Sequence, residues 1–177
     1  MRKRLFLLLL AFISLCQMYA VERTKLNFNG GWLLKVGDFQ GAELANYKDA
    51  GWKQITLPRA FNEKEAFKVS IEQLSDTIMW YRKHFHIQEV GDRKYFIEFE
   101  GVRFGADIWL NGKKVGYTEN GVMASGFDLT PYIIKGENVI AVRVDNSWSY
   151  RERATGQRYQ WNDKNFNANY GGIPKNV

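Results

Sequence analysis

The sequence has few of the residues on which disulfide bonds, metal centres and phosphate loops depend. Among 177 residues there are three prolines, two histidines and one cysteine, Cys16. A single cysteine forms no disulfide within the chain, and two histidines without a third ligand at a suitable spacing do not make a zinc site. The glycine-containing segment 101–112 continues as a predicted strand rather than a helix, which argues against a nucleotide-binding phosphate loop. We therefore expect neither a metal nor an organic cofactor.

The chain also lacks a hydrophobic run long enough to cross a membrane. Its longest uncharged apolar stretch, residues 5–15, is shorter than the span of about 20 residues that a bilayer requires. This stretch follows three basic residues at positions 2–4 and precedes the small residue Ala20. That order is typical of a secretory signal peptide. We expect residues 1–20 to be a signal peptide that is cleaved after Ala20, and residues 21–177 to be one periplasmic or secreted domain.

Lipid anchoring through Cys16 is the alternative localisation, because bacterial lipoproteins are modified on a cysteine at the end of the signal. Leu15 is larger than the residue that usually precedes such a cysteine. Three of the 25 basic residues and none of the 19 acidic residues lie in the first twenty, so the net charge of the rest is +3 rather than +6. A charge of this size indicates neither nucleic acid nor anionic lipid as a partner.

Short runs of β-branched and aromatic residues, separated by turn residues, dominate the rest of the chain. No segment shows a sustained helical period. Asn111 and Gly112 supply the two positive-φ residues of a type I′ hairpin. The predicted strands are 31–36, 52–57, 79–87, 93–101, 106–112 and 138–146.

This spacing predicts an all-β fold of antiparallel strands, a sandwich or jelly roll. In the run 93–101, alternation places Tyr95, Ile97 and Phe99 on one face and Phe96 and Glu98 on the other. The charged segment 60–77 is predicted to be an insertion outside the sheets. We expect the core to contain Trp32, Ile97, Phe99, Ile108, Leu110, Ile140, Val142 and Val144.

Individual polar residues offer weak signals for catalysis or metal binding. His84 and His86 are two residues apart in a predicted strand and share a face, but we interpret them as polar residues on a solvated surface. Ser125 and Ser149 lack the Gly-x-Ser-x-Gly setting of a nucleophilic serine. None of these four residues predicts an active site.

Paired carboxylates perform glycoside hydrolysis, and the sequence contains one such pair on a predicted strand. Glu98 and Glu100 alternate on one strand face, which places them about 7 Å apart. Exposed strands often carry such pairs, and we do not interpret this one as catalytic.

The segment 150–172, named here the polar tail, is the most informative part of the sequence. It is rich in amide, charged and aromatic side chains and has little apolar content to bury. Sugars present hydroxyls that bind amides and carboxylates, and apolar ring faces that pack on aromatic rings. An ordinary polar loop remains the other interpretation. The residues concerned are Arg151, Arg153, Arg158, Tyr159, Trp161, Asn162, Asp163, Asn165, Asn167 and Asn169.

Seven ordered blocks of sequence resemble the N-terminal sugar-binding domain of glycoside hydrolase family 2, which includes β-galactosidases, β-glucuronidases and β-mannosidases. The resemblance covers residues 26–177 and is closest to galactosidase-type members from gut bacteria. The blocks are GWLLKVGD, WKQITLPRAFN, MWYRKHF, FEGVRFGADIWLNGKKVG, GFDLTPYI, GENVIAVRVDN and NYGGIPKNV.

The resemblance implies a jelly-roll domain that precedes an immunoglobulin-like domain and a (β/α)₈ barrel carrying both catalytic glutamates. It also implies that the loop before the Gly-Gly-Ile turn contributes an acidic or amide side chain to the sugar. The substrate-binding candidates are Asp163, Asn165, Asn167, Asn169 and Trp161, and the expected partners are a terminal β-linked sugar such as galactose and the missing barrel domain. The alternative function is a free-standing secreted carbohydrate-binding module without catalysis.

Overall fold

The computed structural model describes residues 23–60, 76–119, 121–158 and 170–177, and these contain ten β-strands in antiparallel pairs. The strands are β1 (Trp32–Val36), β2 (Lys53–Ile55), β3 (Arg59–Ala60), β4 (Ile78–Ile87), β5 (Phe96–Phe99), β6 (Gly105–Leu110), β7 (Lys113–Thr118), β8 (Ser125–Asp128), β9 (Gly136–Asp145) and β10 (Gly172–Ile173). The signal-peptide prediction concerns residues outside these ranges. Within them, no helix is long and apolar enough to span a membrane.

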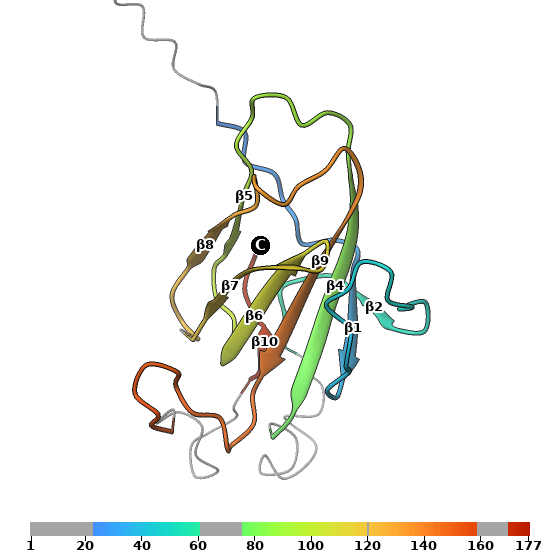
Figure 1. Ribbon diagram of the computed structural model, residues 1–177. Coiled ribbons are helices and arrows are strands. Elements are labelled where there is room, and N and C mark those ends of the chain that lie inside the picture. The colour runs from blue at the N-terminus through green and yellow to red at the C-terminus, as the bar shows by residue number, and fades with distance from the viewer. Residues whose placement is uncertain (1–22, 61–75, 120, 159–169) are drawn as a thin grey trace, which may run out of the picture.

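Six strands form one large sheet in the order β2-β1-β4-β9-β6-β7, and the two pairs β5-β8 and β10-β3 form smaller sheets beside it (Figure 1). The long strands β4 and β9 pair from Ile78 opposite Asp145 to Ile87 opposite Gly136. Interior strands of this kind direct successive side chains to opposite faces. The all-β antiparallel jelly-roll prediction is therefore confirmed.

The main core lies between the large sheet and the smaller sheets. Met79 and Tyr81 of β4 are buried there, and so is Ile173 of β10. Burying an aliphatic or aromatic side chain of this size stabilises the fold by about 1.5–3 kcal/mol. Every predicted core residue is at most 5% exposed, which confirms the list Trp32, Ile97, Phe99, Ile108, Leu110, Ile140, Val142 and Val144.

The predicted hairpin is present between β6 and β7. Asn111 has φ 54° and Gly112 has φ 80°, and Leu110 pairs with Lys113 directly across this two-residue turn. The Asn111 side chain accepts a hydrogen bond from the Val139 amide at 2.9 Å. It also donates to the side-chain oxygen of Asn138 at 2.8 Å. These bonds connect the turn to the start of β9.

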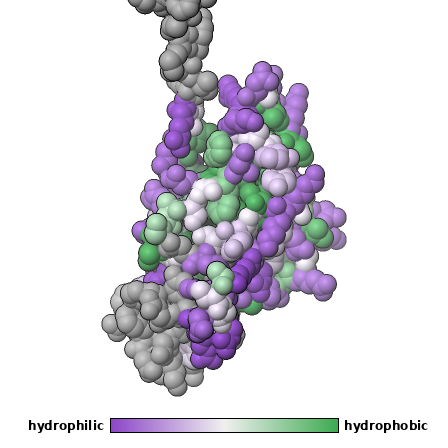
Figure 2. Space-filling view, turned by 60° about the vertical axis from the view of Figure 1, so that its left-hand side comes forward, coloured by the Kyte–Doolittle hydropathy of each residue, from purple (hydrophilic) through white to green (hydrophobic). Residues whose placement is uncertain are grey.

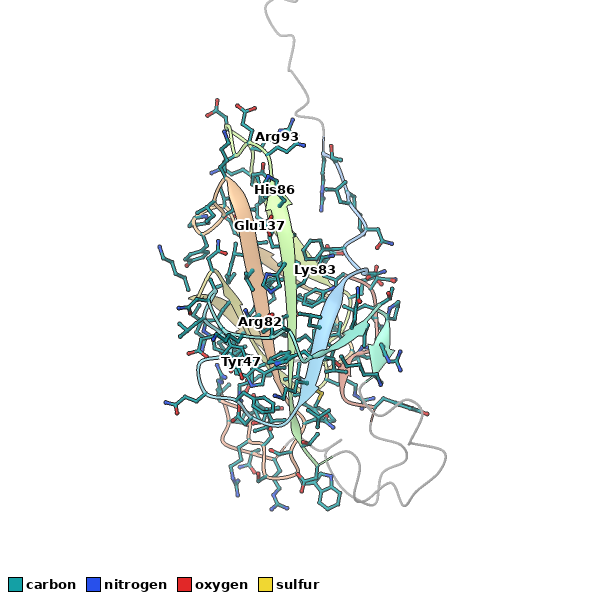
Figure 3. The ribbon with its side chains drawn as sticks, turned by 90° about the vertical axis from the view of Figure 1, so that its right-hand side faces the viewer. Tyr47, Arg82, Lys83, His86, Arg93 and Glu137 are labelled. Atoms are coloured by element: carbon teal, nitrogen blue, oxygen red, sulfur yellow. The ribbon has the colours of Figure 1, made fainter. Side chains whose placement is uncertain are left out.

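A second, smaller hydrophobic cluster covers the opposite face of the large sheet. The segment 37–52, named here the outer-face loop, crosses this face and packs Ala42 and Trp52 near Trp80 of β4. Arg82 is fully buried beneath the loop, and its Nε donates to Asp49 Oδ2 at 2.7 Å. Figure 3 shows Tyr47 and Arg82 side by side, and the guanidinium carbon lies 5.5 Å from the centre of the Tyr47 ring.

Two sequence predictions need correction. Ala60, the first residue of the predicted insertion, belongs to β3, because its backbone pairs with Gly172 and its side chain is buried. The strand predicted at 93–101 is shorter than expected, since only Phe96–Phe99 pair with β8. The alternation within it is confirmed: Ile97 and Phe99 are buried, while Phe96 is 66% exposed. The part of the predicted insertion at 61–75 lies outside the described residues.

Candidate functional site

Strand ends from the large sheet meet at one end of the sandwich, the lower end in Figure 1. The pairing places Gly105 and Ile78 opposite Asp145 on its two sides, and Ala106 opposite Thr118. The chain around positions 103–105 and the segments after Thr118 and Asp145 therefore lie at this end. We call it the loop end.

The two described parts of the polar tail, its start and its end, both lie at the loop end. Its predicted sugar-binding residues, Trp161, Asp163, Asn165, Asn167 and Asn169, lie outside the described residues, and so do Tyr159 and Asn162. The two flanks of the tail, 150–158 and 170–172, are described. These flanks define where the tail attaches to the domain.

The first flank is a short turn that is closed by backbone bonds. Arg151 and Arg158 form an antiparallel bridge. Inside this bridge, Glu152 N donates to Gln157 O at 2.9 Å, and Gly156 N donates to Glu152 O at 2.8 Å. The Arg151 guanidinium donates to the Gly156 carbonyl at 2.9 Å. Arg151 therefore holds the turn together.

The second flank is held by the strand segment that leads into β6. Gly172 and Arg103 exchange two backbone hydrogen bonds, each 2.8 Å long, and Gly172 also pairs with Ala60 of β3. A Cβ on Gly121 would lie 2.9 Å from Arg103 Cγ, so glycine there lets the Arg103 side chain pass close to the backbone. The second flank thus has a defined position beside Arg103.

Tyr150 connects the first flank to the same segment. Its ring lies over Gly105, where an added Cβ would approach Tyr150 Cζ to 2.2 Å, so a larger residue there would require the ring to shift. The phenol donates a hydrogen bond to the Glu119 carboxylate, which also accepts from the backbone of Arg153 at 2.8 Å. Burial and the bond to Glu119 raise the pKa of Tyr150 well above its ordinary value, so this residue is a neutral donor at neutral pH.

An ion-pair cluster completes the attachment of the first flank. Arg153 donates to Asp107 Oδ2 at 2.6 Å, and Lys114 Nζ lies 2.7 Å from Asp107 Oδ1. Burial opposes ionisation of Asp107, but the hydrogen bonds from Arg153 and Lys114 outweigh it, and the pKa of this carboxyl is lowered. The Arg153 guanidinium also lies 4.5 Å from the centre of the Tyr117 ring.

The loop end is therefore a frame that fixes both ends of the polar tail. Tyr150 and Arg153 attach the first flank, and backbone pairing with Arg103 and Ala60 holds the second.

Arg151 and Arg153 were named only as part of the polar tail, and the structure engages both in bonds within the chain. The sequence analysis did not identify Asp107 as the partner of Arg153, or Glu119 as the partner of Tyr150. One signal was available, because Asp107 is an acidic residue inside the otherwise apolar strand 105–110.

The remaining polar candidates have partners that explain them structurally. His84 and His86 share the outer face of β4, as predicted, and each lies against a carboxylate, Asp49 at 2.8 Å and Glu137 at 2.9 Å. Within the described ranges, no group of three or more histidine, cysteine or acidic side chains is placed to hold a metal ion. His86 and Glu137 are visible in Figure 3 on neighbouring strands.

The serines and the glutamate pair likewise contact nearby polar groups. Ser125 Oγ lies 2.8 Å from Thr118 Oγ1, and Ser149 Oγ donates to Ser147 at 3.3 Å. Glu98 lies 3.9 Å from Lys25 Nζ. Glu100 accepts a hydrogen bond from the side chain of Asn176 at 2.8 Å. None of these contacts forms a nucleophile and base pair.

Comparison with known proteins identifies relatives for nearly the whole described domain. Residues 53–175 match the family described as glycosyl hydrolase 2 galactose-binding domain-like. A β-glucuronidase from Formosa agariphila is 37% identical over 167 residues, which cover 88% of this chain and 17% of that protein. A β-galactosidase from Bacteroides ovatus is 32% identical over 133 residues, which cover 71% of this chain and 17% of that protein.

The structural comparison agrees with the sequence comparison. The solved structure of a β-glucuronidase from glycoside hydrolase family 2 has a TM-score of 0.73 and 33% identity to this chain. The match covers 88% of this chain and 18% of that structure. The chain therefore spans less than one fifth of the length of these relatives.

Proposed function

The chain belongs to the galactose-binding domain-like family of glycosyl hydrolase 2 N-terminal domains, and from this premise we propose that it is the sugar-contacting domain of a secreted, retaining β-glycosidase. The observation that carries the proposal is the frame at the loop end. The first flank packs Tyr150 over Gly105 and bonds to Glu119 and Asp107, and the second flank is hydrogen-bonded to the backbone of Arg103. A polar segment held at both ends can present amide and carboxylate side chains to one ligand with less loss of conformational entropy.

Catalysis is proposed to reside in other domains of a longer protein. Retaining hydrolysis needs two carboxyl groups about 5–5.5 Å apart across the scissile bond. The relatives of this chain are several times longer than the region they share with it. Exposed apolar side chains on the domain, including Phe96, Val122 and Met123, support a further domain as the partner. Figure 2 shows hydrophobic patches between polar surfaces on the side where β5 and β8 lie.

The proposed substrate is a terminal β-linked sugar, with galactose as the first candidate. Glucuronate is the second candidate, because the Formosa agariphila protein that is 37% identical is a β-glucuronidase. Hydrolysis of nitrophenyl β-galactoside and nitrophenyl β-glucuronide by the longer protein distinguishes the two. The 177-residue chain by itself is expected to hydrolyse neither, and turnover by the purified chain would contradict the proposal.

Replacement of Asp163 by alanine in the longer protein tests the role of the polar tail. A carboxylate that accepts hydrogen bonds from sugar hydroxyls contributes about 1.5–3 kcal/mol. We therefore expect kcat/KM to fall by roughly ten- to a hundredfold, at 1.4 kcal/mol per factor of ten, with an unchanged melting temperature. Asp92→Ala is the matched control, because Asp92 is an exposed aspartate in another turn.

The outcomes of this experiment separate the candidates. Equal kcat/KM for Asp163→Ala and the parent would remove Asp163 from the site, and Asn165, Asn167 and Asn169 would then be tested in the same way. If none of the four replacements lowers kcat/KM, the proposed role of the tail is wrong. Saturable sugar binding together with an open reading frame that encodes no further domain would instead support the free-standing binding module.

A further inference from the structure

We propose that a pocket on the outer face of the large sheet is a binding site for a neutral pyranoside sugar. The pocket has a volume of about 470 Å³ and is lined by side chains from three strands and the outer-face loop. This volume is in the range of about 300–1,000 Å³ that is usual for small-molecule sites. None of its lining residues belongs to the polar tail, so the inference goes beyond the proposed function.

Two tryptophans form the apolar wall of the pocket. Trp80 of β4 and Trp109 of β6 stack with ring centres 5.4 Å apart and an angle of 27° between the rings. Strand β9 runs between these two strands and places the small residue Ala141 directly opposite Trp109. The short side chain of Ala141 leaves the indoles room to meet above β9. Trp80 is buried, whereas Trp109 is half-buried and available to a ligand.

A preformed ion pair provides the polar wall. Arg143 of β9 donates from Nε to Asp38 Oδ1 at 2.9 Å and from a terminal nitrogen to Asp38 Oδ2 at 2.7 Å. The Trp80 indole donates to Asp38 Oδ1 at 3.1 Å. The Asp38 side chain is nevertheless 49% exposed. The exposed half of this side chain is open to solvent, where a carboxylate can accept a further hydrogen bond from a hydroxyl.

These two walls match the two surfaces of a pyranose. The C–H face of the ring packs on an indole, while the hydroxyl edge binds carboxylate, amide and guanidinium groups. Gln40 and Glu43 from the outer-face loop supply further polar groups at the rim. An aromatic face combined with a few fixed polar groups is the usual design of a specific small-molecule site.

The charge of the lining selects for a neutral sugar. Asp38 and Glu43 are acidic and Arg143 is the lining cation, so the lining carries a net charge of −1. The guanidinium already forms a bidentate pair with Asp38 and is therefore not free to bind a uronate carboxylate in that geometry. A glucuronide anion would also be repelled by Glu43. On this charge argument we expect the pocket to bind neutral rings in preference to uronates, and a galactoside serves as the neutral probe.

The binding experiment uses the full 177-residue chain, with methyl β-galactoside and methyl β-glucuronide as probes. Titration is followed by amide and indole NMR shifts. We expect saturable shifts at the indole of Trp109 and the amide of Ala141 with the galactoside, and none with the glucuronide. Trp109→Ala should weaken galactoside binding by about tenfold, as followed at the amide of Ala141, because it removes the stacking face.

Two further variants keep the test decisive if Trp109→Ala folds poorly. Asp38→Asn preserves shape but removes the carboxylate charge, and it should also weaken binding. Phe96→Ala is the control, since Phe96 is an exposed aromatic residue on β5, in another sheet, and its loss should leave the shifts unchanged. Absence of saturable shifts in the parent, equal binding by Asp38→Asn and the parent, or tighter binding of the glucuronide would each overturn the proposal.

Discussion

Replacement of Arg82 by methionine is expected to destabilise the domain strongly, because Arg82 is a fully buried charge that holds the outer-face loop. Its Nε atom bonds to Asp49, and one terminal nitrogen bonds to the carbonyls of Ala42 and Leu44. Methionine has a similar length and fills much of the same space. It would leave the Asp49 carboxylate and both carbonyls without these donors.

The size of the destabilisation depends on which interactions Asp49 keeps after Arg82 is replaced. Removal of one member of a buried ion pair costs about 3–5 kcal/mol, because the other charge stays buried without compensation. His84 still lies 2.8 Å from Asp49, and its side chain is 43% exposed. We therefore expect about 3 kcal/mol, the lower end of that range, which corresponds to a decrease in melting temperature of roughly 6–12 °C for a domain of this size.

Urea denaturation and thermal unfolding measure this loss. The double variant Arg82→Met/Asp49→Asn should be more stable than the sum of the two single losses predicts, because it removes the uncompensated charge together with its partner. Lys53→Met is the control, as Lys53 is an exposed cation on β2. A free energy of unfolding for Arg82→Met within about 0.5 kcal/mol of the parent, the range of ordinary surface changes, would refute the argument.

Two further predictions concern the loop end. Asp107→Asn should lower the free energy of unfolding at pH 7 by about 1 kcal/mol, a value reduced by the exposure of Arg153 and Lys114. Because the pKa of Asp107 is lowered in the folded state, this stabilisation is present above an ordinary aspartate pKa of about 3.9. It disappears as the pH falls through the lower folded-state value, so urea titrations of parent and variant should converge in acid; a difference that persists there would contradict the assignment. Gly105→Ala should cost about 1–3 kcal/mol by overpacking against Tyr150. Gly126→Ala, whose added Cβ would meet nothing closer than 3.9 Å, is its control in thermal unfolding, and equal melting temperatures of the two variants would show that Tyr150 moves aside at little cost.

The sequence predicts those parts of the fold that depend on local pattern. Alternation in β5 identifies Ile97 and Phe99 as core residues, because a strand with one buried face has a period of two. Asn111 and Gly112 identify a tight turn, because the type I′ geometry needs two residues with positive φ. Both predictions are confirmed, since each depends only on neighbours in the chain.

Predictions fail where a residue's role depends on a distant segment. Ala60 was placed in an insertion because charged residues follow it, but it pairs with Gly172, far away in the sequence. Arg153 lies in the polar tail, and nothing in the composition of the tail predicts that its guanidinium bonds to Asp107 of β6. Composition describes what a side chain can bind. It does not show which of two compatible partners, a ligand or another part of the chain, the fold brings within reach.

The outer face of the large sheet is the clearest case of this limit. Alternation in β4 places Met79 and Tyr81 on one face of the strand and Trp80 and Arg82 on the other. Because Arg82 is charged, the sequence pattern favours a solvated second face. The outer-face loop covers that set instead. Trp80 and Trp109 both lie on the face opposite the main core. Large aromatic side chains are usually buried, so two tryptophans on this face indicate that a second layer or a ligand covers it. Arg82 binds the loop from beneath, and the loop carries Asp38 to Arg143. The residue that looks least suited to a buried strand is therefore the one that fastens the outer-face loop, the segment that also contains Asp38 of the proposed sugar pocket.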